Sequence, residues 1–154
     1  MVRLICAFIL VLLLVSPSLA QQSLVGTYKI VSHVAELGGT PTEPYGKTPH
    51  GYLVLTPTRA IAFYTGDNRK FGTSVDDKAA LLDSLTGWSG VYRVEGSKLV
   101  IRVDASWLQN WTGKDQIRNW QVSGNRLTLT SDPQPFAKDP SKTVVIRQVW
   151  EKLE

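Results

Sequence analysis

Side chains able to act as general bases or nucleophiles are scarce in this chain of 154 residues. His33 and His50 are its two histidines, and Cys6 is its one cysteine. Period-two alternation places His33 on the same face as Lys29, and therefore outward, while His50 only precedes a strand-like run. The chain contains no HExxH, Gly-x-Ser-x-Gly, P-loop or dinucleotide motif. We therefore assign no catalytic residue and expect no metal site and no cofactor.

Gln116 and Arg118 form the most informative polar pair. They lie two residues apart and in phase with Trp120, so alternation directs all three toward the core. A buried guanidinium is costly unless a partner compensates its charge. Asp104 is the nearest candidate, although its own strand directs it outward unless a bulge shifts the phase. A bound carboxylate or enolate is a second possible partner, and a solvated Arg118 at a barrel mouth is the third reading.

The elements that position this pair are short alternating runs separated by Gly, Pro, Asn and Asp, the pattern of half-buried antiparallel strands. Short connections such as Glu95-Gly96-Ser97 favour hairpins between sequence neighbours. Closure removes the exposed edges of such a sheet, so we predict an all-β, eight-stranded antiparallel up-and-down β-barrel able to enclose one small ligand. The predicted strands are Leu24 to Ala35, Gly51 to Thr56, Arg59 to Tyr64, Trp88 to Glu95, Lys98 to Asp104, Gln116 to Val122, Leu127 to Thr130 and Thr143 to Glu151.

One helix is predicted over Val75 to Leu85, between the third and fourth strands. Ser74 is a suitable N-cap, and Asp76 and Asp77 occupy the first turn. Such a helix either covers one mouth of the barrel or packs against the barrel, and both readings remain open. The aromatic connection Trp107 to Trp111 likewise either lies over a cavity or packs on the rim.

Alternation also yields the candidate ligand contacts. If Lys29 faces the solvent, alternation places Ser32 and Val34 on the inner face of the same strand. In the same way, a solvent-facing Arg93 places Tyr92 on the inner face. The remaining positions on these inner faces are mostly apolar, which is typical of a binding cavity with a few convergent polar groups. The predicted ligand-binding residues are Tyr28, Ser32, Tyr92, Gln116, Arg118 and Trp120.

The first twenty residues have the features of an export signal. Arg3 precedes an apolar run too short to cross a bilayer comfortably, and small residues precede Gln21. We expect Met1 to Ala20 to be removed, which leaves one domain over residues 21 to 154 that is periplasmic or secreted, without stable membrane insertion. An uncleaved membrane anchor is the alternative. The net charge of +4 is spread along the chain without a basic block, so we expect no nucleic-acid partner.

Several segments occur in an order that resembles the small bacterial and fungal lipocalin-like domain family. They are Leu24 to Tyr28, Pro44-Tyr45-Gly46, Gly51-Tyr52-Leu53, Thr56-Pro57, Gly90-Val91-Tyr92, Asn110 to Gly113, Gln116-x-Arg118, Gly124 to Leu129 and Val149-Trp150-Glu151. The resemblance implies a lipocalin-type barrel with a central pocket. Gly26-Thr27-Tyr28 is similar to the Gly-x-Trp signature of true lipocalins, with Tyr in place of Trp. Relatives often carry His in the fifth strand, where this chain has Ile101 and Arg102.

The function that needs the fewest special residues is the binding of a small apolar or amphipathic molecule inside the barrel. The first alternative is a cofactor-free isomerase or cyclase that shapes an apolar metabolite, for which Tyr28, Tyr92, Gln116 and Arg118 would suffice. A structural barrel filled with side chains is the third possibility. A large interior cavity would exclude the filled structural barrel and leave the binding protein and the isomerase or cyclase.

Overall fold

The computed structural model describes residues 21, 23–136 and 139–154. The predicted export signal Met1 to Ala20 lies outside the described residues and remains a prediction. The strands are β1 (Gly26–Leu37), β2 (Thr40–Thr42), β3 (His50–Leu55), β4 (Arg59–Thr65), β5 (Leu85–Glu95), β6 (Lys98–Ser106), β7 (Asp115–Ser123), β8 (Arg126–Thr130), β9 (Gln134–Phe136) and β10 (Asp139–Lys152). The helices are α2 (Val75–Asp83) and the short 3₁₀ helix η1 (Gln109–Trp111).

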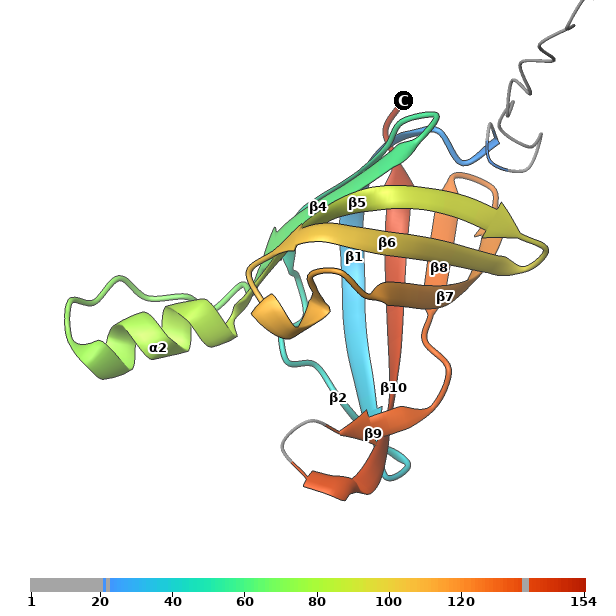
Figure 1. Ribbon diagram of the computed structural model, residues 1–154. Helices are drawn as coiled ribbons and strands as arrows, with labels where there is room; N and C mark the ends of the chain where they lie inside the picture. Colours follow the sequence, from blue (N-terminus) through green and yellow to red (C-terminus); the bar gives the residue numbers. More distant parts are fainter. Residues whose placement is uncertain (1–20, 22, 137–138) are drawn as a thin grey trace, which may run out of the picture.

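Eight of these strands close into a barrel (Figure 1). Their order is β1-β3-β4-β5-β6-β7-β8-β10, each pairs antiparallel with the next, and β10 returns to pair with β1. Closure leaves no free edge along most of the sheet, as the alternating runs predict. The all-β class and the eight-stranded up-and-down barrel are confirmed.

Two short strands at one end of the barrel were not predicted. β2 pairs with the end of β1, and β9 pairs with the beginning of β10. Each contains a proline, Pro41 or Pro135, which cannot donate to a ladder and is tolerated mainly at edges. Three residues with a central proline carry too little alternation to be recognised as a strand.

The helix α2 begins at Val75, as predicted, because Ser74 caps it. The Ser74 hydroxyl accepts from the Asp77 backbone N–H at 3.1 Å, and the Asp77 carboxylate accepts in return from the Ser74 N–H at 3.2 Å. The helix buries none of its residues and projects away from the barrel (Figure 1), so both predicted packing arrangements are wrong. The β4–β5 ladder continues to the Thr65–Leu85 pair, so the segment between these strands, which contains α2, begins and ends beyond the end of the barrel. No helix among the described residues is long and apolar enough to cross a bilayer.

One half of the barrel interior is solidly packed. The N-terminal segment covers this half: Leu24 is fully buried, and the Gln21 side chain donates to the Pro57 carbonyl at 2.7 Å. Trp150 of β10 lies within it at 1 % exposure. This packed half also contains Tyr28, Ile30, Leu53, Leu55, Ala60, Tyr92, Leu99 and Leu127.

A β-bulge in β1 decides which side chains of this strand face inward. Ile30 pairs with Trp150 and Ser32 pairs with Val149, so one extra residue separates the two pairs. One extra residue moves every later side chain of the strand to the opposite face of the sheet. The prediction that Ser32 and Val34 face inward is therefore wrong, as is the prediction that His33 faces outward.

Candidate functional site

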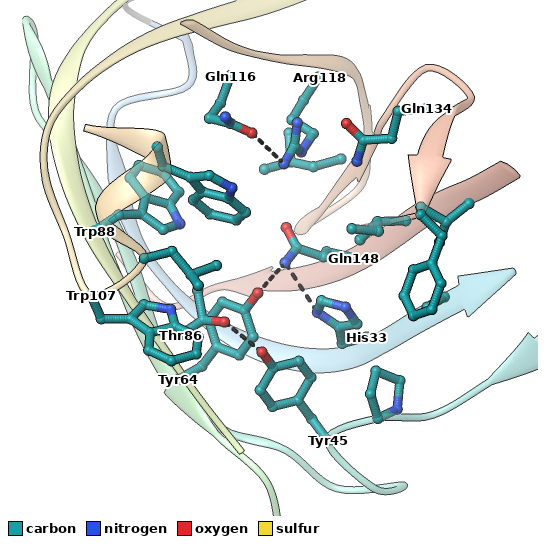
Figure 2. A pocket seen from close by; sticks show the side chains of 18 of the residues that line it. His33, Tyr45, Tyr64, Thr86, Trp88, Trp107, Gln116, Arg118, Gln134 and Gln148 are labelled. Carbon is teal, nitrogen blue, oxygen red and sulfur yellow. Dashed lines mark hydrogen bonds between the residues drawn. The ribbon is translucent and has the colours of Figure 1, made fainter. Parts of the chain in front are cut away.

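The other half of the barrel holds a cavity of about 440 Å³ (Figure 2). Its walls are mostly apolar and aromatic, with polar side chains from several strands directed into it, which is the usual composition of a small-molecule site. The apolar part of the wall comprises Ala35, Leu37, Pro44, Trp88, Ile101, Trp107, Leu108, Trp111, Leu129, Pro135, Phe136, Val144 and Ile146. A barrel filled throughout with side chains is thus not what this chain forms.

A group of hydrogen-bonded polar side chains surrounds His33. Beyond the bulge His33 pairs directly with Gln148 of β10, and the Gln148 amide nitrogen lies 3.2 Å from His33 Nδ1. The same nitrogen donates to the Tyr64 hydroxyl at 2.7 Å (Figure 2). His33 is 5 % exposed and lines the cavity together with Tyr64 and Gln148. The bulge therefore brings a histidine into the binding cavity.

Tyr45 reaches this group from the loop between β2 and β3. Its hydroxyl is 2.5 Å from Thr86 Oγ1, and its ring lies 4.6 Å from the His33 ring, centroid to centroid. The next residue, Gly46, has a φ of 75°, and a side chain there would collide with the Asp67 carboxylate. That carboxylate accepts from the Thr48 backbone N–H at 2.9 Å and so holds the loop in place.

Gln116 and Arg118 of β7 line a separate part of the cavity wall (Figure 2). Arg118 Nη2 donates to Gln116 Oε1 at 3.3 Å, and Nη1 donates to the Ile117 carbonyl at 2.8 Å. Asp104 is not its partner, because this carboxylate binds Arg59 and the Ser89 hydroxyl on the outside of the barrel. Among the described residues no carboxylate lies within 4.0 Å of the Arg118 guanidinium.

Burial sets the pKa values of the cavity residues, and Arg118 is the charged side chain among the described residues that line the cavity. Burial lowers the pKa of His33 to about 4, and the positive charge of Arg118 contributes to the shift. Burial raises the pKa of both Tyr45 and Tyr64, and it lowers the pKa of Arg118, although the Tyr64 hydroxyl and the more distant Asp132 act in the opposite direction. An arginine remains protonated at neutral pH even so. None of the described residues that line the cavity is acidic, so the cavity carries one positive charge at neutral pH.

The buried His33 should make the protein less stable in mild acid. Its pKa is about 4 in the folded state and about 6.5 in the unfolded state, so below pH 6.5 the unfolded state binds more protons. We expect this residue to cost about 2 kcal/mol of unfolding free energy between pH 7 and pH 5, with the loss levelling off below pH 4. Urea denaturation across this range measures the effect.

The control for this pH experiment is the comparison of two variants. His33→Gln keeps a hydrogen-bonding side chain opposite Gln148 and should flatten the acid-dependent loss. His50→Gln replaces the exposed histidine and should leave the loss as in the wild type. An unchanged pH dependence in His33→Gln would contradict the burial of a neutral imidazole.

The structure brings together only two of the six predicted ligand contacts. Gln116 and Arg118 line the cavity, and their contact with a ligand stays a prediction. Tyr28 and Tyr92 lie in the packed half, where their hydroxyls donate to the Leu24 and Thr56 carbonyls at 2.8 Å each. Trp120 packs against the core and donates to the Gly96 carbonyl at 3.2 Å, and Ser32 is displaced by the bulge. These four residues do not line the cavity.

Several polar cavity residues were not identified from the sequence. Alternation predicts the wrong face for His33, and no pattern in the last strand distinguishes Gln148. Tyr45 lies in a loop, and only the Pro44-Tyr45-Gly46 segment of the family resemblance hinted at it. Thr86 lies in a part of β5 that precedes the predicted start of this strand at Trp88. The aromatic connection contributes Trp107, Leu108, Asn110 and Trp111 to the cavity wall, and Trp111 also packs against the core, so both predicted arrangements occur.

Comparison with known proteins identifies one family. A sequence model described as a lipocalin-like domain matches residues 25–153, which is nearly the whole described barrel. No curated protein matches the chain significantly. The described residues contain no group of three or more His, Cys, Asp or Glu side chains able to hold a metal ion.

Proposed function

Because the chain belongs to the lipocalin-like domain family, whose barrels in general bind small hydrophobic molecules, we propose that it binds an apolar or amphipathic ligand inside this cavity. The apolar body of the ligand occupies the aromatic part of the cavity, and its polar end reaches Gln116 and Arg118. The protein releases the ligand without changing it chemically. Its preferred polar group is an anion such as a carboxylate or an enolate.

The observation that carries this proposal is the guanidinium of Arg118, which lines a largely apolar cavity and has no carboxylate within 4.0 Å among the described residues. Burying such a charge is costly, and the described protein residues offer only the carbonyl of Ile117 and the amide of Gln116 as acceptors. An anionic ligand would supply the missing charge through bidentate hydrogen bonds, for which arginine is well suited. The absence of acidic residues from the described lining favours the same ligand charge.

We further propose that this binding takes place outside the cytoplasm, after removal of Met1 to Ala20. The charged start, the short apolar run and the small residues before Gln21 support export. N-terminal sequencing of protein from the extracytoplasmic fraction should begin at Gln21. A chain recovered from the membrane with Met1 to Ala20 still attached would contradict both the cleavage and the location.

Ligand binding should change the fluorescence of the tryptophans that line the cavity. Titration with a fluorescent fatty-acid probe is expected to quench the emission of Trp88, Trp107 and Trp111, and dodecanoate should displace the probe. Leu37→Trp narrows the cavity at a lining position and should weaken the binding of the probe by tenfold or more.

Phe63→Trp is the matched control, because Phe63 lies on the outer face of β4 and is 57 % exposed. This variant should bind the probe like the wild type. Equal binding by Leu37→Trp and the wild type would show that the probe binds elsewhere on the protein and would contradict the proposed site.

A cofactor-free isomerase is the second candidate function, and the position of His33 favours it. Alternation in the sequence predicts an outward-facing His33, whereas the bulge places its neutral imidazole and the Arg118 guanidinium around one cavity. A base and a cation are the groups needed to move a proton within a bound carbonyl compound. Mass spectrometry and NMR of probes recovered after incubation distinguish the two functions, since binding alone returns each probe unaltered.

A further inference from the structure

The barrel wall has an opening between β7 and β8. The β7–β8 ladder begins at the Asn119–Thr130 pair, so Asp115 to Arg118 has no partner on this side. The chain turns away after β8, and the Ser131 N–H donates to the Ile146 carbonyl of β10 at 2.8 Å. The first half of β7 therefore faces the segment from Ser131 to Gln134 across a gap in the hydrogen bonding.

A second cavity, of about 220 Å³, occupies this opening. It is lined by Asp115, Gln116, Ile117, Arg118, Ser131, Asp132, Pro133 and Gln134. Gln116, Arg118 and Gln134 also line the main cavity, so the two cavities meet at these side chains. Figure 2 shows the three side chains together along one part of the main cavity, away from Tyr45 and Thr86.

The two cavities differ in chemistry. The main cavity is largely apolar, whereas all but Ile117 and Pro133 of the residues around the second cavity have polar side chains. Arg118 lies at their boundary, with its guanidinium directed by bonds to Gln116 and to the Ile117 carbonyl. A ligand anchored on Arg118 would thus have apolar surroundings in the main cavity and polar surroundings in the second cavity.

The carboxylates of the second cavity already have cationic partners. Asp132 binds Lys98 at 3.1 Å and the Asn119 amide at 2.6 Å, and Asp115 binds Arg102 at 3.2 Å. Their negative charge is therefore compensated, but each carboxylate has lone pairs that accept further hydrogen bonds. This arrangement favours a neutral group that donates hydrogen bonds, such as a hydroxyl, over an additional cation.

We propose that the second cavity is a subsite for a small, neutral, hydroxyl-bearing head group. The ligand class is a conjugate in which an apolar acyl or aryl body is joined, through an acidic or carbonyl group held by Arg118, to this head group. The inference rests on the proposed binding function, because the apolar body must occupy the main cavity. Asp132 accepts the hydrogen bond from the head group.

Three probes test the subsite by calorimetry on the full mature chain. Dodecanoate fills only the main cavity, and N-dodecanoyl-serine adds a carboxylate and a hydroxyl beyond the acyl group. N-dodecanoyl-alanine differs from it by the loss of that hydroxyl alone. We expect the serine conjugate to bind about tenfold more tightly than the alanine conjugate, as a hydrogen bond to a charged acceptor implies. Dodecanoate should also bind, as the proposed function requires.

Asp132→Ala should remove the tenfold advantage of the serine conjugate over the alanine conjugate. Asp76→Ala, which replaces an exposed carboxylate on α2, is the matched control and should keep the advantage. N-dodecanoyl-O-methylserine cannot donate this hydrogen bond and tests it in the wild-type protein, so the experiment does not depend on the folding of the Asp132 variant.

Equal binding of the serine, alanine and O-methylserine conjugates, alongside normal dodecanoate binding, would overturn the subsite alone. Failure of dodecanoate itself to bind would overturn the proposed function and the subsite with it.

Discussion

Replacing Arg118 by alanine is expected to weaken the binding of dodecanoate by about 10- to 100-fold. A hydrogen bond between charged groups contributes about 1.5 to 3 kcal/mol, and this cavity has no other described cation to take its place. Dodecanol, which has the same chain without the charge, should lose much less. Calorimetric titration of both ligands against both proteins measures the difference directly.

Arg93→Ala is the matched control for this experiment. Arg93 is an exposed arginine whose side chain binds Glu95 and lies 4.0 Å from Asp115, and neither acid lines the main cavity, so its removal changes the net charge without altering that cavity. Binding of dodecanoate and dodecanol should remain as in the wild type. Equal losses for the acid and the alcohol in Arg118→Ala would refute the assigned role of this residue.

Trp150→Ala is expected to lower the free energy of unfolding by about 3 to 5 kcal/mol, the usual cost of truncating a large buried aromatic side chain. Trp150 lies in the packed half of the barrel at 1 % exposure, and its ring makes an edge contact with Tyr64 at 5.6 Å between centroids. It also lies on β10, the strand that closes the barrel against β1. Urea denaturation monitored by circular dichroism gives the loss.

Trp150→Phe separates packing from hydrogen bonding at the same position. The buried indole Nε1 has no hydrogen-bond partner among the described residues, so phenylalanine removes an unsatisfied donor together with part of the ring. We expect a loss of only about 1 to 2 kcal/mol. Phe63→Ala on the exposed outer face should change stability by about 0.5 kcal/mol or less. A Trp150→Ala protein as stable as the Phe63→Ala protein would contradict the assigned packing.

Alternation predicts the barrel well because each long strand has one buried face. It also places Gln116 and Arg118 correctly toward the interior, since β7 is regular over these residues. The same rule fails in β1, where one extra residue after Ile30 exchanges the two faces. The segment Val31-Ser32-His33-Val34 contains no glycine or proline to signal a bulge, so its sequence is compatible with either register.

The rest of the candidate site depends on contacts between distant segments. His33 and Gln148 are 115 residues apart and meet only because β10 closes the barrel against β1. Tyr45 meets Thr86 across 41 residues from a loop that has no periodic pattern. Local propensity carries no information about such pairings, which follow from the register of the closed sheet.

The separation of the barrel into a packed half and a hollow half has a consequence for how such proteins diverge. The buried side chains of Trp150 and Leu127 do not line the cavity, whereas the groups proposed to select a ligand do. If the proposed function holds, we expect substitutions at the polar cavity residues to change ligand specificity at a smaller cost to folding than substitutions in the packed half. This fold can accordingly acquire new ligands one side chain at a time while each intermediate protein still folds.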